Sequence, residues 1–324
     1  MNKSLPQFTS VLAPHFVKLI EEQKAAGYKT TNMHLKKLDQ FLNEQGLKKA
    51  VLPQKMVELW LRRRENESPG TYEVRLCAVR VFARFLTRQN ISAFSPPKFS
   101  TPKFIRSFVP YIFSREEIAR LFKAADYLEK TKLRYWHFSY FHIVIRLLYS
   151  TGLRSGEVNG LIWRHVDLKN GILTICQGKF LKDRLVPLSS QMAKCLCEYA
   201  RKHPCHPNEP VFPSMRGKHC HPSQFYRLFR EVLKQAKIPH GGKGKGPRLH
   251  DLRHTFAVHN LENWLKSKQN LQAKLPILAD YLGHTSLLGT QKYLRLTQYI
   301  FPEIVTRMEK SIGKSIRNLE RETH

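Results

Sequence analysis

The first 95 residues contain four stretches in which apolar residues recur at steps of three and four. The stretches are 8–20, 33–42, 56–61 and 74–86. This spacing is that of one helix face, so each stretch predicts an amphipathic helix. Helix breakers follow several of the stretches, among them Gly27, Gly46 and the Ser-Pro-Gly sequence at 68–70. The pattern therefore predicts a helical domain over residues 1–95.

A proline-rich segment ends this periodic region. Pro96, Pro97 and Pro102 lie close together, and no helical or strand period continues through them. We expect a linker over 96–109 and a second domain over 110–324. Within the second domain, Ser114 and Glu117 have the spacing of a capping box that opens a helix.

The second domain mixes helical and strand patterns. Residues 138–149 form an apolar helical stretch, while 171–176 and 184–188 alternate as strands on either side of a short polar segment. This arrangement predicts a β-hairpin, and helical patterns dominate the remainder. The expected fold class is mainly α with a small antiparallel β-sheet.

The charge balance is far from that of an average globular protein. The 55 Lys and Arg residues against 25 Asp and Glu residues give a formal net charge of +30. The excess is present both before and after Ile105, which favours a body that faces a polyanion over a single basic tail. An anionic membrane surface is the rival partner, but the chain has no apolar run of about 18 residues. We expect a cytoplasmic, nucleic-acid-binding protein without a membrane segment.

Basic residues on the helical domain allow two interpretations. The set comprises Arg62, Arg63, Arg64, Arg75, Arg80, Arg84 and Arg88. These side chains either contact phosphates or form a solvated helix face.

The six cysteines are expected to be reduced thiols of a cytosolic protein. Cys205 and Cys220 lie within two His-rich segments, 203–206 and 219–221, that can supply zinc ligands. Neither segment has the ligand spacing of a tetrahedral zinc site, so a proline-rich surface loop is favoured and no metal is predicted.

Three places along the second domain carry candidate phosphate chemistry. Arg154 lies between glycines in Thr-Gly-Leu-Arg-Ser-Gly-Glu, where it can grip two phosphate oxygens or pair with Glu157. Lys179 falls at the predicted hairpin tip, where it is either a reaching or a simply exposed lysine. His250 and Arg253 share one helix face, as a catalytic pair or as a buried His beside an ion-paired Arg.

The order and local context of six residues resemble the tyrosine recombinase family, which includes phage integrases and Xer proteins. They are Arg154, Lys179, His250, Arg253, His284 and Tyr293. The basic helical domain resembles the core-binding domain of that family. The resemblance extends over nearly the whole chain.

The resemblance implies an enzyme that cuts and rejoins DNA. Tyr293 would attack a scissile phosphate, leaving a 3′-phosphotyrosyl bond and a free 5′-hydroxyl. Arg154 and Arg253 would clamp the phosphate, where fixed positive charge stabilises the transition state. The partner is double-stranded DNA that carries a specific recombination site.

The resemblance also assigns the proton transfers. His250 would act as the general base, Lys179 as the general acid and His284 as a hydrogen-bond donor to the phosphate. Because the covalent bond conserves the phosphodiester energy, no cofactor, ATP or metal is expected.

The loop before His250 reads His-Gly-Gly-Lys-Gly-Lys-Gly-Pro-Arg from residue 240. Lys243, Lys245 and Arg248 are predicted to contact the DNA backbone there, although a merely flexible loop is the alternative. A Walker A motif is excluded because no Gly-Lys-Ser/Thr follows the glycines.

Residues 263–274 are a polar insertion longer than in Xer proteins. This difference favours an integrase or transposase of a mobile element over Xer-type chromosome or plasmid dimer resolution.

The last segment has apolar residues at Phe301, Ile304, Val305, Met308 and Ile312, which predict a C-terminal tail helix. The stripe either packs on its own domain or docks on a neighbour in a homotetramer around two DNA duplexes.

Two further function classes remain open. One is a DNA-binding regulator that no longer cuts, against which the complete six-residue set argues. The other is a metal-dependent nuclease, for which Asp251 and Glu157 lack carboxylate partners nearby in sequence.

Overall fold

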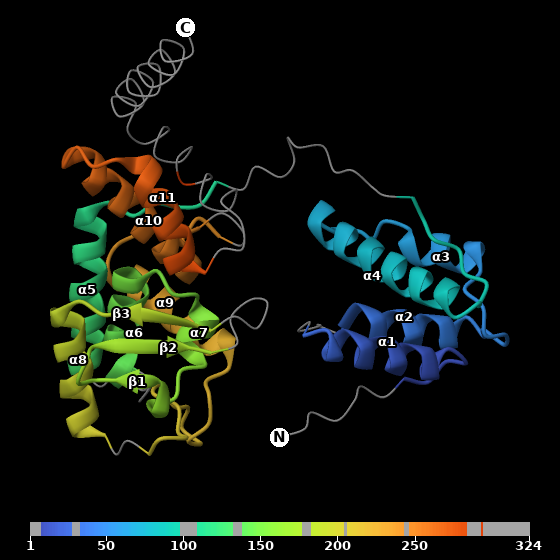
Figure 1. Cartoon of the computed structure of the whole chain (residues 1–324), viewed down its shortest axis with the longest axis horizontal. Helices are drawn as coiled ribbons and strands as arrows, with labels where there is room; N and C mark the ends of the chain where they lie inside the picture. Colours follow the sequence, from blue (N-terminus) through green and yellow to red (C-terminus); the bar gives the residue numbers. More distant parts are fainter. Residues whose placement is uncertain are drawn as a thin grey trace, which may run out of the picture. The chain divides into compact units, whose positions relative to one another are not determined.

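A computed structural model describes residues 8–27, 33–97, 109–131, 138–176, 183–203, 206–242, 246–283 and Tyr293. The chain divides into two units, Met1–Phe108 and Val109–His324 (Figure 1). Lys179, Lys243, Lys245, His284 and the predicted tail helix lie outside the described residues.

The N-terminal unit is helical in its described part. Its helices are α1 Ala13–Ala25, α2 Met33–Glu44, α3 Gln54–Leu61 and α4 Pro69–Arg88. The apolar faces of the helices meet in one core, in which the Phe16 and Phe82 rings stack with centroids 3.7 Å apart. Each predicted helix is therefore present.

The first helix begins later than its apolar pattern suggests. Residues 8–12 precede α1 because their polar groups are held by Asp39 of α2. The Thr9 and Ser10 backbone N–H groups donate to the Asp39 carboxylate at 2.7 and 3.1 Å. The Asp39 carboxylate thus satisfies two backbone N–H groups and holds this segment ahead of the first turn of α1.

Arg75 contradicts the prediction of a solvated or phosphate-binding face. Its side chain is 2% exposed and pairs with Glu67, Nη2 to Oε2 at 2.7 Å. It also donates to the carbonyl oxygens of Trp60 and Arg62 at the end of α3. Backbone carbonyls at a buried helix end need donors, and Arg75 supplies them.

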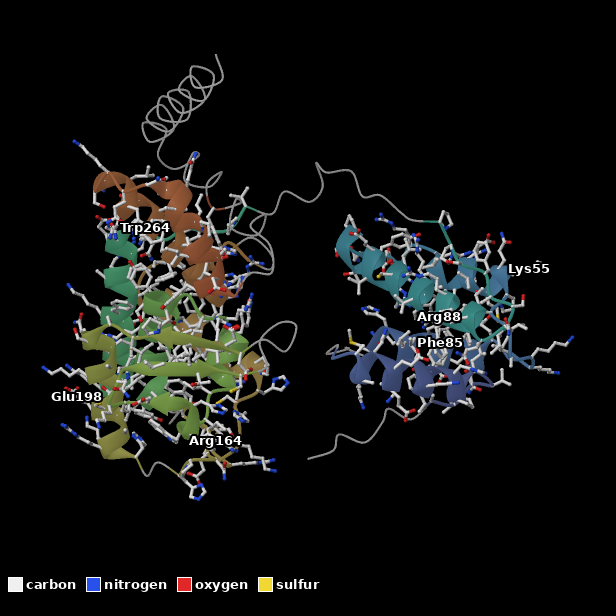
Figure 2. All side chains as sticks on the ribbon, viewed as in Figure 1. Lys55, Phe85, Arg88, Arg164, Glu198 and Trp264 are labelled. Carbon is white, nitrogen blue, oxygen red and sulfur yellow. The ribbon has the colours of Figure 1, made fainter. Side chains whose placement is uncertain are left out.

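Other arginines of α4 lie at the surface. Arg84 is exposed, and Arg88 pairs with Glu22 of α1 at 3.1 Å. Arg88 also lies over the Phe85 ring, 5.8 Å from its centroid (Figure 2). For Arg80 and Arg84, the two predicted interpretations, a solvated helix face and contact with phosphates, therefore both stay predictions.

The C-terminal unit contains a small sheet among helices. Its described helices are α5 Arg115–Lys130, α6 Phe138–Thr151, α7 Ser155–Asn159, the 3-10 helix Trp163–His165, α8 Ser190–Lys202, α9 Pro222–Gln235, α10 Leu249–Lys266 and α11 Leu271–Leu282. The strands are β1 Val166–Asp167, β2 Ile172–Ile175 and β3 Arg184–Pro187, antiparallel in that order. The predicted fold class is confirmed.

The sheet contains one strand, β1, that the sequence pattern does not predict. Thr174 of β2 lies opposite Leu185 of β3, as expected for the hairpin. The additional strand β1 pairs through only two residues, Val166 and Asp167, which is too short for alternation to be visible in sequence.

Helix α6 is the central element of this unit. It packs against α5, α8 and α10, and Val144 and Leu147 on it are fully buried. Its N-terminal neighbour α5 opens with the predicted capping box of Ser114 and Glu117. Helix α11 contacts both α10 and β3. Arg253 in the first turns of α10 donates to Gly152 just after α6 and to Leu282 at the end of α11, so the C-terminal ends of α6 and α11 lie at the start of α10.

The polar segment 263–274 is mostly helical. It forms the last turn of α10 and the first turn of α11, with Asn270 as the N-cap that accepts hydrogen bonds from the N–H groups of Gln272 and Ala273. Its polar residues therefore extend helices instead of forming a long loop.

The His-rich segment at 219–221 has structural contacts. His219 Nδ1 lies 2.8 Å from the carbonyl oxygen of Asn159, Cys220 Sγ lies 2.9 Å from the Tyr140 hydroxyl, and His221 caps α9. Within the described ranges, no group of three or more His, Cys, Asp or Glu side chains can hold a metal ion. Cys205 lies outside those ranges.

No helix in the described part of the chain is both long and apolar enough to cross a bilayer.

Replacing Arg75 with Met should destabilise the N-terminal unit by about 3 to 5 kcal/mol, since Glu67 would remain buried without its partner. Denaturant unfolding of the full-length chain, followed by circular dichroism, measures this loss. Arg84→Met is the matched control because Arg84 is exposed on the same helix. Equal stability of the two variants would contradict the structural role of Arg75.

Candidate active site

The turn after α6 is built around Gly152. Its φ of +60° is left-handed, and a Cβ there would lie 2.5 Å from Phe256 Cδ1 and 2.9 Å from Leu282 Cδ2. A larger residue would therefore push α10 and α11 away from α6. The Gly152 carbonyl oxygen accepts a hydrogen bond from Arg253 Nη1 at 2.8 Å.

Arg253 is a buried cation on α10. It is 1% exposed, and its Nη2 donates to the Leu282 carbonyl oxygen at 2.7 Å. Burial, followed by the positive charge of Arg154, lowers its pKa to about 10. The guanidinium nevertheless stays protonated at neutral pH, held in a fixed plane by two backbone acceptors.

Three arginines bind three consecutive carbonyl groups at the end of α11. Arg184 Nε donates to the Tyr281 oxygen at 3.1 Å, Arg253 Nη2 to Leu282, and Arg154 Nη2 to the Gly283 oxygen at 3.1 Å. We call residues 281–283 the α11 turn. Its carbonyls carry the negative end of the helix dipole, which favours cations.

Gly283 closes the α11 turn in a left-handed conformation with φ of +66°. A Cβ at this position would lie 3.0 Å from Arg184 Nη1. Glycine therefore satisfies both the helix termination and the close approach of the arginine.

Glu157 of α7 joins two of these arginines. Its Oε1 accepts from Arg154 Nη1 at 2.7 Å and from Arg184 Nη1 at 3.0 Å, while Oε2 accepts from Arg184 Nη2 at 2.8 Å. Burial acts to raise the pKa of Glu157, but hydrogen bonds from Arg184 and Arg154 and the charge of Arg184 bring it to about 2. The carboxylate is thus ionised at all physiological pH values.

Tyr293 lies beside Arg253. The tyrosine is 3% exposed and packs with apolar residues of α10 and α11. Burial raises the pKa of its hydroxyl, while the charge of Arg253, a hydrogen bond with Arg253 and the charge of Arg154 act in the opposite direction. The phenol is therefore protonated at neutral pH and faces two guanidinium groups.

His254 of α10 lies next to this phenol, and His250 lies next to His254, one helix turn earlier. The His250 and His254 rings have centroids 4.8 Å apart, and the His254 ring centroid is 5.5 Å from that of Tyr293. Burial, then the charges of Arg253 and Arg154, lowers the pKa of His250 to about 4. The His250 imidazole is therefore neutral at pH 7 and able to accept a proton.

The structure thus brings together four of the six predicted residues: Arg154, His250, Arg253 and Tyr293. Lys179 and His284 lie outside the described residues. Arg154 also pairs with Glu157, so the two interpretations of Arg154 in the sequence are compatible.

Sequence reasoning missed Arg184 and His254. His254 was detectable, because it is four residues from His250 and so shares its helix face. Arg184 gave no such signal, since its partners are distant in sequence.

Arg248 occupies the N-cap position of α10. Its Nη2 lies 3.3 Å from Asp251 Oδ1, and its side chain is 42% exposed. A cationic group thus lies at the N-terminal end of α10. Lys243 and Lys245 of that loop lie outside the described residues.

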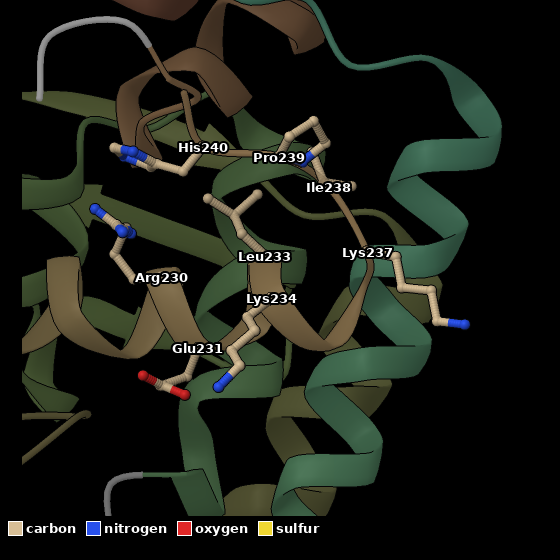
Figure 3. A pocket seen from close by; sticks show the side chains of 8 residues that line it. All are labelled: Arg230, Glu231, Leu233, Lys234, Lys237, Ile238, Pro239 and His240. Atoms are coloured by element: carbon tan, nitrogen blue, oxygen red, sulfur yellow. The ribbon is translucent and has the colours of Figure 1, made fainter. Parts of the chain in front are cut away.

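A basic pocket of about 490 Å³ lies at the C-terminal end of α9 (Figure 3). Arg230, Lys234, Lys237 and His240 contribute nitrogen-bearing side chains, and Glu231 is its acidic residue. The pocket is on the chain segment that leads towards Arg248 and His250. Its charge suits an anionic ligand.

The His250 imidazole should titrate near pH 4 in the DNA-free protein. Unfolded His has a pKa of about 6.5, so between these values the unfolded chain binds a proton that the folded chain does not. His250 therefore lowers stability as the pH falls through that window. Imidazole ¹⁵N shifts, assigned by comparison with His250→Asn, test this. A midpoint near 6.5 would show that the ring is not desolvated as described.

Comparison with known proteins gives consistent matches. The sequence matches the phage integrase family over residues 112–299. The putative integrase/recombinase y4rB of Sinorhizobium fredii is 32% identical over 260 residues, which are 78% of this chain and 82% of the relative. Tyrosine recombinase XerD of Oceanobacillus iheyensis is 29% identical over 247 residues, 74% of this chain and 76% of the relative.

The fold is shared with the integrase of transposon Tn1549, solved in complex with a circular intermediate DNA. The TM-score is 0.61 at 13% identity, over 86% of this chain and 94% of that one. The family match covers more than half of the chain, and the y4rB match covers most of both proteins. The chain therefore belongs to the phage integrase family of tyrosine recombinases, enzymes that cleave and rejoin DNA.

Proposed function

We propose that this chain is the integrase or transposase of a mobile element, acting on double-stranded DNA in the cytoplasm. Tyr293 attacks the scissile phosphorus, the P–O5′ bond breaks, and a 3′-phosphotyrosyl intermediate and a 5′-hydroxyl result. The observation that carries this proposal is the buried Tyr293 hydroxyl hydrogen-bonded to Arg253. Attack by a 5′-hydroxyl on the phosphotyrosine then reseals the strand.

Arg154 and Arg253 form the phosphate clamp. Both guanidiniums are held by carbonyls of the α11 turn, so their positions are set before DNA arrives. The equatorial oxygens of pentavalent phosphorus gather negative charge, and fixed cations beside them lower the barrier. No reorganisation of the two arginines is then needed during the reaction.

His250 takes the proton of Tyr293. The raised pKa of the phenol makes it a weak nucleophile on its own. The neutral His250 imidazole, one turn of α10 before His254, can accept its proton. His254 neighbours both residues, with its ring centroid 4.8 Å from that of His250 and 5.5 Å from that of Tyr293.

Lys179 protonates the leaving 5′-oxygen, and His284 donates a hydrogen bond to the phosphate. Support comes from their chain neighbours. Arg184 begins β3 directly after the segment that carries Lys179, and it touches Glu157 and the α11 turn. Gly283, which directly precedes His284, accepts from Arg154.

The reaction requires neither metal nor ATP. The carboxylates named as metal-ligand candidates are already bound: Glu157 pairs with two arginines and Asp251 accepts from the Arg248 backbone N–H at 2.8 Å. Cations for transition-state stabilisation come from the arginines, which argues against the metal-dependent nuclease. The phosphotyrosine bond conserves the energy for rejoining.

DNA contacts extend beyond the cluster. Lys243, Lys245 and Arg248 bind backbone phosphates next to the scissile bond, and residues 1–95 form a core-binding domain joined by the linker 96–109 to the catalytic domain 110–324. Support comes from two basic features of the catalytic unit, the half-exposed Arg248 and the basic pocket of α9. The net charge of +30 suits such a partner.

Integration of a mobile element is favoured by the y4rB relative, whose name reads putative integrase/recombinase. Dimer resolution of the Xer type is the second candidate, because XerD is similar over 74% of the chain. Sequencing the DNA that flanks covalent adducts in cells separates them. Element ends are expected, and a single chromosomal locus per replicon would favour resolution instead.

The active assembly is proposed to be a homotetramer on two duplexes, coupled by the apolar positions of 301–312. Light scattering of protein–DNA complexes should give four protomers. Truncation after residue 300 should reduce that number without removing DNA binding.

A covalent adduct should form when the protein meets its site in nicked DNA, since the nick lets the short 5′ strand diffuse away. The probe is a pool of short nicked duplexes with one randomised arm beside the nick. Adducts that resist denaturant are isolated and sequenced, which also identifies the site. Undiminished yield in EDTA is expected.

Tyr293→Phe is the control for this adduct, because it removes the nucleophilic oxygen and keeps the buried ring. It should abolish the adduct while leaving DNA binding intact. An adduct that survives this substitution would assign the nucleophile elsewhere, and binding without any wild-type adduct would favour the non-cutting regulator.

DNA affinity should fall steeply with salt. Each phosphate neutralised by Lys or Arg contributes about −0.9 to the slope of log K against log salt concentration. Fluorescence anisotropy from low to moderate salt measures the slope. A flat plot would contradict a charge-driven interface.

A further inference from the structure

Arg184, the first residue of β3, uses one guanidinium to join two elements of the active site. Its Nη1 and Nη2 grip both oxygens of Glu157, and its Nε reaches the Tyr281 oxygen. The side chain is 13% exposed, so these contacts are largely shielded from water. Such a bidentate, buried pair is among the strongest that side chains form.

We propose that Arg184 is a positioning residue for cleavage: it holds Arg154 and the α11 turn in the geometry that receives the scissile phosphate. The inference rests on the proposed function, since it assumes that Arg154 binds that phosphate. Arg184 acts through its neighbours and need not touch DNA.

The first reason is electrostatic. Arg154 and Glu157 alone form a neutral pair, in which the carboxylate competes with a DNA phosphate for Arg154. Arg184 occupies both oxygens of Glu157, so the three-residue cluster carries a net charge of +1. Part of the positive charge of Arg154 is thereby left for the phosphate.

The second reason is geometric. The α11 turn holds Arg253 through Leu282 and Arg154 through Gly283, and Arg184 holds the same turn through Tyr281. A displacement of this turn would therefore move both clamp residues together. Displacements of about 1 Å in such sites are enough to lower rates about 100-fold.

Lysine cannot reproduce these contacts. Its ammonium is a point charge on a flexible stem, while the three Arg184 contacts need a planar fork with donors on two sides. Arg184→Lys therefore keeps the charge and loses the geometry, and Arg184→Met loses both.

The experiment measures the rate of covalent adduct formation on the nicked duplex selected above, with protein saturating over DNA. Arg184→Met should slow the reaction about 100-fold and Arg184→Lys about 10-fold, with DNA affinity unchanged within about twofold. Arg146→Met is the matched control. Arg146 also makes a bidentate pair with a carboxylate, that of Asp126, with hydrogen bonds of 2.8 and 2.7 Å, and it does not contact the three-residue cluster in any described hydrogen bond. It should react like the wild type.

A double-mutant cycle distinguishes positioning from general damage. Because Arg184 acts through Arg154 and through the turn that also holds Arg253, Arg184→Met should slow the Arg154→Met protein by a clearly smaller factor than it slows the wild type. Multiplying effects would mean that Arg184 acts independently, which would overturn the proposal. Thermal unfolding accompanies every variant, and Arg184→Lys supplies the comparison if Arg184→Met does not fold.

Two results separate this inference from the proposed function. A wild-type protein that forms no adduct would contradict the recombinase mechanism itself. A wild-type protein that forms the adduct, with Arg184→Lys and Arg184→Met equally fast, would refute the role of Arg184 alone.

Discussion

The candidate active site depends on one interaction repeated three times: a guanidinium that donates to a carbonyl of the α11 turn. The arginines come from the start of α7, from β3 and from α10, and the acceptors are consecutive residues of one chain segment. Helix ends leave carbonyls without partners, and here those carbonyls gather cations from separate elements. Fold and site are therefore stabilised by the same hydrogen bonds.

Much of the fold could be predicted from periodicity, because helix faces such as that of α4 and the hairpin strands repeat locally. The capping box at Ser114 can also be predicted, because its two residues, Ser114 and Glu117, are only three positions apart. Arg75 was misjudged because its partners at the end of α3 are set by tertiary packing, which an arginine-rich helix face does not reveal. The strand β1 was missed because two residues carry no period.

The candidate site likewise contains residues that local sequence predicts and contacts that only tertiary packing creates. Arg154, His250, Arg253 and Tyr293 were found through motif context, and the structure places them together. The pairing of Arg184 with Glu157 was not predictable, since β3 and α7 meet only after the sheet and helices have packed. Local sequence thus identifies the candidate reacting groups, and long-range contacts determine how they are aligned.

Burial of Arg253 has a consequence for the thermodynamics of DNA binding. Its guanidinium has already exchanged its hydration shell for the carbonyls of Gly152 and Leu282 during folding. A phosphate that binds Arg253, as proposed, would therefore not have to strip water from this cation. Desolvation of Arg253 lowers the free energy of unfolding of the chain, and it does not weaken the free energy of DNA binding.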